Sequence, residues 1–221
     1  MVTNKEIQLI AKELNLYNIS NGTIDLEDEK VSNKEYLYSI LLQEINIRHA
    51  NKLKELRKSS KLPDKAFDYL RISEGLKWQI DKVKNIDFPN SSENIFIVGE
   101  CSTGKTALAS EIGNAALDKG ARVIYITIDN LLLQYKYKKK QWDFILNCDV
   151  VIVDELFYVQ PTDEELLAIY KILIFLQETR TLILITNRAL FTWKEMKVDT
   201  HLIETLQKRL IADAQVITLS Y

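Results

Sequence analysis

Eight consecutive residues, GECSTGKT (99–106), have the residue types and spacing of a phosphate-binding loop. They fit the pattern G-x-x-x-x-G-K-[ST], in which glycines let backbone N–H groups point at phosphate oxygens and the next helix adds the positive end of its dipole. Lys105 can reach the β- and γ-phosphates of ATP, and the Thr106 hydroxyl can bind Mg²⁺. We therefore expect ATP and Mg²⁺ as cofactors. The residues expected to contact the nucleotide are Gly99, Glu100, Cys101, Ser102, Thr103, Gly104, Lys105 and Thr106.

Two residues of this loop are unusual. Ser102 stands where many such loops have a third glycine, and a serine costs little there if its φ angle is negative. Cys101 is interpreted as a small loop residue. We expect both residues to affect nucleotide affinity rather than the fold.

A pair of acids follows another apolar run. DVVIV (149–153) predicts a buried strand, and Asp154 and Glu155 come directly after it, where open α/β sheets bind their ligands. Asp154 is expected to bind the metal and its water shell, and Glu155 to activate the attacking water as a general base. The alternative is a strand end capped by two solvated acids. The loop upstream favours the catalytic interpretation.

An amide follows a further predicted strand. Asn187 comes directly after TLILIT (181–186), and at that edge of a sheet it can orient the water near the γ-phosphate. An asparagine after a strand is usually a turn residue, so this position is weak evidence alone. With the loop and the acid pair it becomes a third component of one site.

The elements that must position these motifs alternate along the chain. Strands are predicted at 95–98, 121–129, 149–153, 181–186 and 215–220, and helices at 105–119, 162–178 and 201–214. Thr162 and Glu165 have the spacing of a capping box at the start of the second of these helices. Strands that are apolar on both faces and alternate with helices indicate a parallel sheet covered on both sides. The predicted fold class is α/β, with a five-stranded parallel sheet.

The N-terminal part of the chain has a different pattern. Apolar residues at helical spacing predict a first helix from Ile7, Ile10, Ala11 and Leu14. Ser32 and Glu35 have capping-box spacing and open a second helix, which SSKLPD (59–64) ends. We predict a helical N-terminal domain over 1–60, for DNA or partner binding or for oligomerisation, and an ATPase domain over 61–221.

Composition limits the class of partner and the compartment. The 221 residues carry a formal net charge of −2, so any nucleic-acid binding must use a local patch rather than a global field. No apolar run approaches the roughly 18 residues needed to cross a bilayer, and the N-terminus lacks a signal-peptide core. Two cysteines give no disulfide framework. We therefore expect a cytoplasmic protein with no membrane partner.

The glycine loop, the acid pair and the asparagine after a strand together resemble the motifs of an AAA+ ATPase. The surrounding sequence resembles the IstB/DnaC family over nearly the whole chain. Residues 36–70 resemble that family's N-terminal helical region and its FDF-type segment, and 93–116 resemble its strand, loop and first helix. DVVIVDELFYV (149–159) resembles its DELGY-type stretch. ITNRALFTW (185–193), followed by LIETLQKRL (202–210), resembles its TTN…W…DRL ending.

The resemblance implies an ATPase that assembles on DNA. Proteins of the IstB type help a transposase to select and use target DNA, whereas those of the DnaC and DnaI type load a replicative helicase. The resemblance implies that Lys105 binds phosphate and that Thr106 binds Mg²⁺. It also implies that Asp154 is the metal-binding acid, Glu155 the catalytic acid and Asn187 the first sensor.

The resemblance also implies a homo-oligomer. Arg209 falls where the family has an arginine finger, a residue that reaches the γ-phosphate held by a neighbouring subunit. Three departures accompany it: Lys208 replaces the preceding Asp, Phe157 replaces the glycine after DEL, and the sequence stops at Tyr221 without a C-terminal lid domain. We expect hydrolysis to be slow until the protein assembles.

A basic stretch lies between the second and third predicted strands. In LLLQYKYKKKQWD (131–143), lysines alternate with aromatic residues, a composition suited to phosphate contact and base stacking. The alternative is a solvated, lysine-rich helix end, and the resemblance favours DNA. The expected DNA contacts are Lys136, Lys138, Lys139 and Lys140.

These features favour an ATP-dependent, DNA-associated helper of a transposase. A helicase loader in DNA replication is the nearest alternative, although loaders usually devote the N-terminal region to gripping a helicase. An ATP-switched interaction module with little hydrolysis is an alternative of another class. A small-molecule kinase is the most distant, because it would need a substrate lid and would leave Arg209 without a neighbour to serve.

Overall fold

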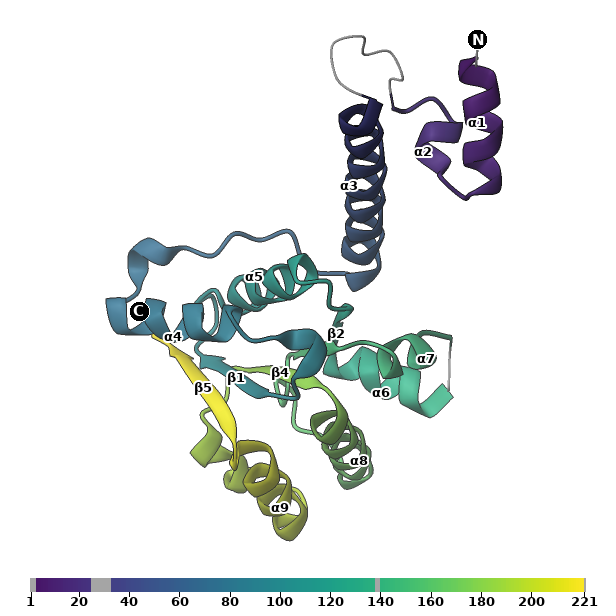
Figure 1. Ribbon diagram of the computed structural model, residues 1–221. Helices are drawn as coiled ribbons and strands as arrows, with labels where there is room; N and C mark the ends of the chain where they lie inside the picture. The colour runs from purple at the N-terminus through teal and green to yellow at the C-terminus, as the bar shows by residue number, and fades with distance from the viewer. Residues whose placement is uncertain (1–2, 25–32, 138–139, 221) are drawn as a thin grey trace. The chain divides into compact units, whose positions relative to one another are not determined.

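The structure of the protein is a computed structural model that describes residues 3–24, 33–137 and 140–220 (Figure 1). It divides into two compact units, Met1–Glu55 and Leu56–Tyr221, which we describe separately. Helix α3 (Asn33–Ser60) runs through the division. The domain boundary between residues 60 and 61 therefore stays a prediction.

The first unit is helical. It contains α1 (Asn4–Glu13), α2 (Tyr17–Ser20) and most of α3, and Thr3 and Glu6 form a capping box at the start of α1. Its core is small. The buried apolar residues of this core are Ala11, Ile19, Ile24 and Ile40. The predicted capping box of the second helix lies partly outside the described residues, because Ser32 is not among them.

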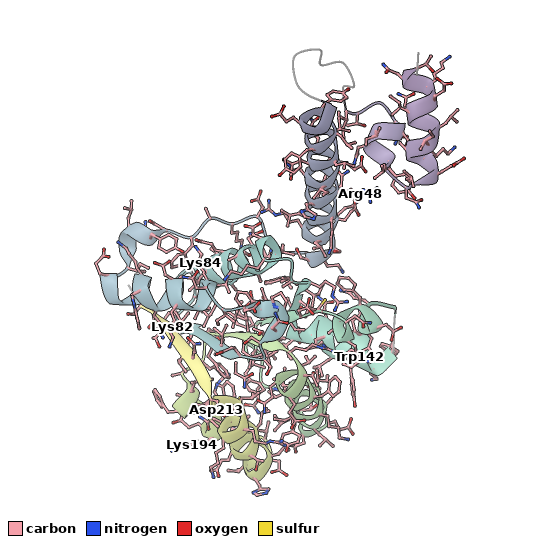
Figure 2. The ribbon with its side chains drawn as sticks, in the orientation of Figure 1. Arg48, Lys82, Lys84, Trp142, Lys194 and Asp213 are labelled. Carbon is pink, nitrogen blue, oxygen red and sulfur yellow. The ribbon has the colours of Figure 1, made fainter. Side chains whose placement is uncertain are left out.

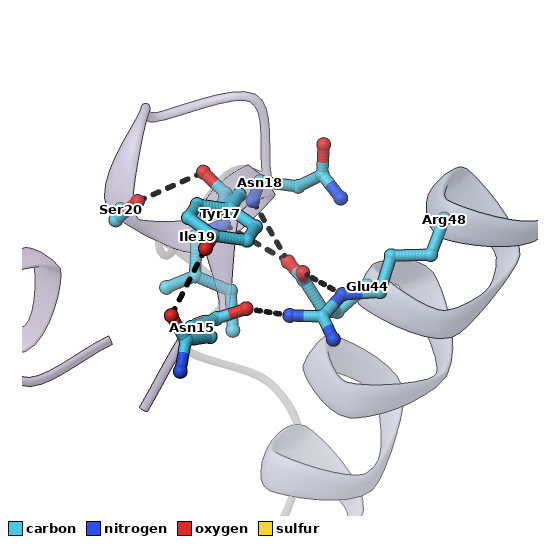
Figure 3. Close-up of polar contacts among 7 residues, drawn as sticks. All are labelled: Asn15, Tyr17, Asn18, Ile19, Ser20, Glu44 and Arg48. Atoms are coloured by element: carbon cyan, nitrogen blue, oxygen red, sulfur yellow. Dashed lines mark hydrogen bonds and ion pairs between the residues drawn. The ribbon is translucent and has the colours of Figure 1, made fainter. Parts of the chain in front are cut away.

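One buried carboxylate joins α2 to α3 in this unit (Figure 3). Glu44 is only 2% exposed, and its Oε2 accepts the backbone N–H groups of Asn18 at 3.0 Å and Ile19 at 3.1 Å. Arg48 donates from Nε to Glu44 Oε1 at 2.7 Å and from Nη2 to the carbonyl of Asn15. Helix α2 has no side-chain cap of its own, so Glu44 satisfies N–H groups of its first turn from outside the helix.

The second unit is built on a five-stranded sheet in the order β2-β3-β4-β1-β5, and every pairing is parallel. The strands are β1 (Asn94–Gly99), β2 (Val123–Thr127), β3 (Val150–Asp154), β4 (Thr181–Thr186) and β5 (Ala214–Leu219). The predicted parallel α/β sheet is confirmed. Two boundaries were wrong. The second strand ends at Thr127, and Ile128 already begins helix α6. The last helix ends at Ile211 rather than at residue 214, which already belongs to β5.

Helices cover both faces of this sheet (Figure 1), with α4 and α5 on one side and α6, α8 and α9 on the other. The helices are α4 (Glu74–Lys84), α5 (Lys105–Asp118), α6 (Ile128–Tyr137), α7 (Lys140–Leu146), α8 (Asp163–Thr179) and α9 (Thr200–Ile211). Short 3-10 helices occupy Tyr69–Arg71, Phe88–Asn90 and Leu190–Glu195. The capping box of Thr162 and Glu165 is confirmed at the start of α8.

A large apolar core fills the face of the sheet towards α8 and α9. It includes Phe96 and Val153 from the sheet, Leu173 and Leu206 from the helices, and the fully buried Trp193. A core of this size fixes the strands against one another, so that residues at their carboxyl ends are held at defined positions. Within the described residues, the structure contains no helix that is both long enough and apolar enough to span a membrane.

Candidate nucleotide-binding site

The predicted loop connects β1 to α5 and passes very close to strand β5. A Cβ atom on Gly99 would lie 2.3 Å from the carbonyl oxygen of Leu219 and 2.8 Å from Thr103 Oγ1, so only glycine fits there. Gly104, with φ 83°, precedes Lys105 at the start of α5. The N–H groups of the first turn of α5 therefore face the end of the sheet at which the strands finish.

Ser102 does not have the negative φ angle that would make a serine inexpensive. Its φ is 65°, in the left-handed region that favours glycine. A non-glycine residue in this region costs roughly 1–2 kcal/mol. The loop therefore keeps the backbone shape of its glycine-containing counterparts, at the expense of strain at Ser102.

The carboxylate of Asp154 is the centre of the polar contacts at this edge. It is 6% exposed, and its Oδ2 accepts the hydroxyls of Thr106 at 2.8 Å and of Tyr125 at 2.7 Å. Its Oδ1 accepts the backbone N–H of Glu155 at 2.7 Å. The carboxylate thus accepts three hydrogen bonds from uncharged donors and lies against the hydroxyl expected to bind Mg²⁺.

The register of the sheet explains why Tyr125 reaches this carboxylate. Tyr125 pairs with Ile152, and Ile152 faces α5, because a Cβ on Gly113 of that helix would lie 3.0 Å from its side chain. Asp154 is two residues beyond Ile152 and so points to the same face. Burial, and then the hydrogen bond and charge of Asp154, raise the pKa of Tyr125, so its hydroxyl remains a protonated donor.

Lys105 extends along the loop. Its Nζ donates to the carbonyl of Glu100 at 2.6 Å. Burial lowers the pKa of Lys105, and the nearby Cys101 and Asp154 act in the opposite direction. The ammonium group is therefore partly desolvated at the position expected for the β- and γ-phosphates.

The turn after β3 is strained and firmly anchored. Glu155 and Phe157 have φ angles of 62° and 58°. The N–H of Leu156 donates to the carbonyl of Ile185 at 3.0 Å, and Arg188 Nε donates to the carbonyl of Phe157 at 2.7 Å. These bonds join the turn to β4 and to the residues after it.

Phe157 occupies the position that is glycine in the resembling family. Its left-handed φ means that the turn keeps a backbone shape suited to glycine. The side chain is buried, and its ring packs edge-on against Trp193 with centroids 4.8 Å apart. Burial of a whole aromatic ring, worth roughly 1.5–3 kcal/mol, offsets the backbone cost.

The loop, the acids and the amide meet around one cavity of about 230 Å³. Its lining residues are Cys101, Ser102, Lys105, Thr106, Asp154, Glu155, Tyr158, Ile185, Thr186 and Asn187. The Oδ1 atom of Asn187 is buried there without a hydrogen-bond partner in the part of the chain that the structure describes. A buried acceptor of this kind requires a donor such as an ordered water.

The donor set of this cavity suits Mg²⁺. No group of three or more His, Cys, Asp or Glu side chains that could hold a metal ion occurs among the described residues. The Thr106 hydroxyl and the Asp154 carboxylate are hard oxygen ligands, which Mg²⁺ prefers. Mg²⁺ is usually held by one or two such protein groups together with substrate phosphates.

Arg209 does not line this cavity. It lies on α9, where its Nη2 donates to Glu178 at 2.8 Å and its Nη1 to the Tyr170 hydroxyl at 3.1 Å. Its guanidinium is therefore held at the surface between α8 and α9. The expected action on a neighbouring subunit stays a prediction.

The basic stretch is only partly described. Lys136 is exposed at the end of α6, with its Nζ 5.8 Å from the ring centroid of Tyr137. Tyr135 and Trp142 pack edge-on against each other at 5.3 Å and pack against the core, so they are packing residues. Figure 2 labels Trp142, which belongs to α7. Two of the expected contacts, Lys138 and Lys139, and the side chain of a third, Lys140, lie outside the described residues.

Sequence reasoning missed Tyr125, Thr186 and Arg188. Thr186 donates from Oγ1 to the carbonyl of Leu156 at 2.8 Å and so supports the acid turn together with Arg188. A signal was present for Tyr125, since it is a polar side chain near the carboxyl end of an apolar strand. Its partner depends on the register between strands, which the sequence does not give.

The parallel sheet, the glycine loop and the hydroxyl–carboxylate contact together define a P-loop nucleotide-binding protein. The family model described as IstB-like ATP binding protein matches residues 10–220, and the chain belongs to that family.

Similar proteins include ATP-binding proteins of insertion sequences. The chain is 25% identical to the insertion sequence IS21 putative ATP-binding protein of Pseudomonas aeruginosa, over 97% of this chain and 86% of the relative. It is 27% identical to the IS5376 protein of Geobacillus stearothermophilus, over 86% of this chain and 79% of the relative. These similarities extend over most of both chains.

The fold also resembles solved structures of replication proteins. The DnaC helicase loader superposes with a TM-score of 0.57 at 17% identity, over 73% of this chain and 97% of that chain. AMPPCP-bound DnaA from Aquifex aeolicus gives 0.56 at 20% identity, over 72% of this chain and 51% of that chain. At such identities the likeness shows the fold alone.

Proposed function

We propose that this protein is an ATPase that assembles as an oligomer on DNA and assists a transposase. The observation that carries the proposal is the single cavity around which Lys105, Thr106, Asp154, Glu155 and Asn187 meet. Membership of a family of ATP-binding proteins supports the choice of nucleotide.

The proposed reaction is hydrolysis of the γ-phosphate of ATP. Lys105 binds the β- and γ-phosphate oxygens, and Thr106 and Asp154 would hold Mg²⁺, which when bound neutralises charge on those oxygens. Asn187 orients a water, and Glu155 accepts its proton as the water oxygen bonds to the γ-phosphorus. The bond from that phosphorus to the bridging oxygen breaks, which gives ADP and phosphate. Glu155 is exposed at the cavity, so it has room to accept a water.

The proposed oligomer completes this site. Arg209 lies on α9 outside its own cavity, where it pairs with Glu178. In an assembly we assign it to the γ-phosphate bound by the adjacent subunit, a role in which arginine fingers raise rates roughly 10³–10⁵-fold. On assembly, Arg209 would have to leave Glu178 and bind the phosphate instead.

The choice of partner rests on the relatives that match along most of their length. Their names place them in insertion sequences, which supports a transposase as partner. A helicase loader is the alternative, and the fold shared with the DnaC helicase loader is compatible with it. The proposed DNA contacts are the lysines of the basic stretch, Lys136, Lys138, Lys139 and Lys140.

Complementation between two inactive variants tests the shared site. We expect Glu155→Gln to bind a fluorescent ATP analogue but to release phosphate at least about 100-fold more slowly than the wild type. Arg209→Ala should also bind nucleotide and lose DNA-stimulated hydrolysis. A mixture of the two should regain partial activity, because a subunit with an intact Glu155 can use the arginine of its neighbour.

Lys105→Ala is the matched control, because it should abolish nucleotide binding in its own cavity and so fail to rescue Glu155→Gln, whose cavity is also defective. Equal phosphate release by wild type and Glu155→Gln would remove Glu155 from catalysis. If sedimentation shows that the mixed variants form oligomers on DNA and the mixture still releases no phosphate, the site is not shared between subunits.

A further inference from the structure

Tyr125 contacts the centre of the site although it belongs to none of the sequence motifs that predict it. Its hydroxyl donates to Asp154 Oδ2 at 2.7 Å, the same oxygen that accepts from Thr106 at 2.8 Å. It comes from β2, whereas the loop and the acids come from β1 and β3. The carboxylate is thus held from a third strand.

We propose that Tyr125 is a positioning residue whose hydroxyl holds the Asp154 carboxylate in the orientation that Mg²⁺-ATP requires. This inference rests on the proposed ATPase function. It assigns the hydroxyl no contact with nucleotide and no step in the reaction.

The need for such a residue follows from the geometry of an aspartate side chain. The torsion that rotates a carboxylate about its Cβ–Cγ bond is broad, so backbone position alone does not fix its two oxygens. The N–H of Glu155 fixes Oδ1 at 2.7 Å, and Tyr125 fixes Oδ2 at 2.7 Å. Two donors on opposite oxygens set the plane of the carboxylate.

Thr106 cannot do this alone. It too donates to Oδ2, but its oxygen is the expected Mg²⁺ ligand, so its hydroxyl must turn to suit the metal. Tyr125 has no such second role, and its ring is held in the sheet in register with Ile152. Its hydroxyl can therefore stay on the carboxylate whether or not nucleotide is bound.

Tyr125→Phe isolates the proposed role, because it keeps the ring and removes only the hydroxyl. The loss of a residue that orients a metal ligand typically weakens metal binding 10–100-fold. Since Mg²⁺ also binds phosphate, we expect the lower end of that range. The Mg²⁺ concentration for half-maximal enhancement of ATP-analogue binding should rise about 10-fold, while binding in EDTA should change less than about twofold.

Tyr69→Phe is the matched control. Tyr69 also donates its hydroxyl to a carboxylate, Glu111 Oε1 at 2.6 Å, but neither residue lines the nucleotide cavity. This variant should have the Mg²⁺ dependence of the wild type. Phosphate release by Tyr125→Phe should fall at limiting Mg²⁺ and recover largely in excess Mg²⁺, with little change in kcat.

An unchanged Mg²⁺ dependence in Tyr125→Phe, or an equal change in both variants, would overturn the inference. Its failure is distinguishable from that of the proposed function. A wild-type protein that binds ATP without hydrolysing it would contradict the proposed function, whereas the binding titration would still decide the role of Tyr125.

Discussion

The N-terminal unit and the nucleotide-binding unit each bury a carboxylate, and the two carboxylates are satisfied in different ways. Glu44 accepts two backbone N–H groups and also pairs with the guanidinium of Arg48 at 2.7 Å. Asp154 accepts hydrogen bonds from two hydroxyls and one N–H. None of the ion pairs formed within the described residues involves Asp154.

This difference separates a structural carboxylate from one that can bind a ligand. A buried charge needs a compensating partner, and Glu44 has one within its own unit. Asp154 has only uncharged hydrogen-bond donors and the more distant charge of Lys105. Its remaining negative charge is therefore available to a cation that arrives with the nucleotide.

The two regions also differ in backbone strain. The described part of the N-terminal unit has one non-glycine residue with a left-handed φ angle, Asn15 at 56°, and asparagine adopts this region more readily than most residues. Three residues at the nucleotide site, Ser102, Glu155 and Phe157, have left-handed φ angles without being glycine. The large core beneath them holds these conformations in place. Among its described residues, the N-terminal unit has four buried apolar residues in its core cluster, so it depends more on the hydrogen bonds of Glu44. Three variants test this contrast.

The largest effect on stability is expected for Glu44→Gln. The amide oxygen can still accept the N–H groups of Asn18 and Ile19, but the amide NH₂ then faces the donors of Arg48. Loss of a hydrogen bond to a charged group costs about 1.5–3 kcal/mol. Hydrogen exchange should show α2 losing protection while the sheet keeps its own. Arg48→Met, which leaves the buried Glu44 carboxylate without its cation, should also lower the protection of α2. Unchanged α2 protection in Glu44→Gln would refute the contrast.

A smaller effect, of opposite sign, is expected for Ser102→Gly. Glycine removes the cost of a left-handed φ, roughly 1–2 kcal/mol, but adds freedom to the unfolded chain worth about 0.4–1 kcal/mol. The net gain should be about 0.5–1 kcal/mol in denaturant unfolding. Ser102→Ala keeps the Cβ atom and should give no gain, so equal stabilities of the two variants would show that the loop is not strained.

The smallest effect on stability is expected for Asp154→Asn. An asparagine can keep the N–H of Glu155 on its oxygen and place its NH₂ against the hydroxyls of Thr106 and Tyr125, which can accept. The free energy of unfolding should change by less than about 0.5 kcal/mol. Enhancement of ATP-analogue binding by Mg²⁺ should nevertheless fall at least about 10-fold. A loss of stability like that of Glu44→Gln would make Asp154 a structural carboxylate after all.

Much of the fold was predictable because its strands are apolar on both faces. The run 181–186 gave the limits of β4, and the capping box of Thr162 fixed the start of α8. These signals are local in sequence. The loop and the acids were predictable for the same reason, since each is a short motif next to a recognisable strand.

The contacts that complete the site were not predictable, because they join distant parts of the chain. Tyr125 and Asp154 are 29 residues apart and meet through strand register, and Glu44 meets Asn18 across 26 residues. The left-handed φ angle of Ser102 could have been inferred from the glycine that many such loops have at this position, but the serine itself gives no such signal. The position of Tyr158 in the cavity lining was not predictable either, because it depends on the shape of the turn after Asp154.

The close approach of Gly99 to Leu219 has a consequence for biosynthesis. Strand β5 forms one wall of the phosphate-binding loop, yet it is the last of the five strands to leave the ribosome. A nascent chain that has already made the loop and both acids still lacks the carbonyl against which the loop rests. Competence to bind nucleotide is therefore acquired only after β5 has emerged, rather than when the loop itself emerges.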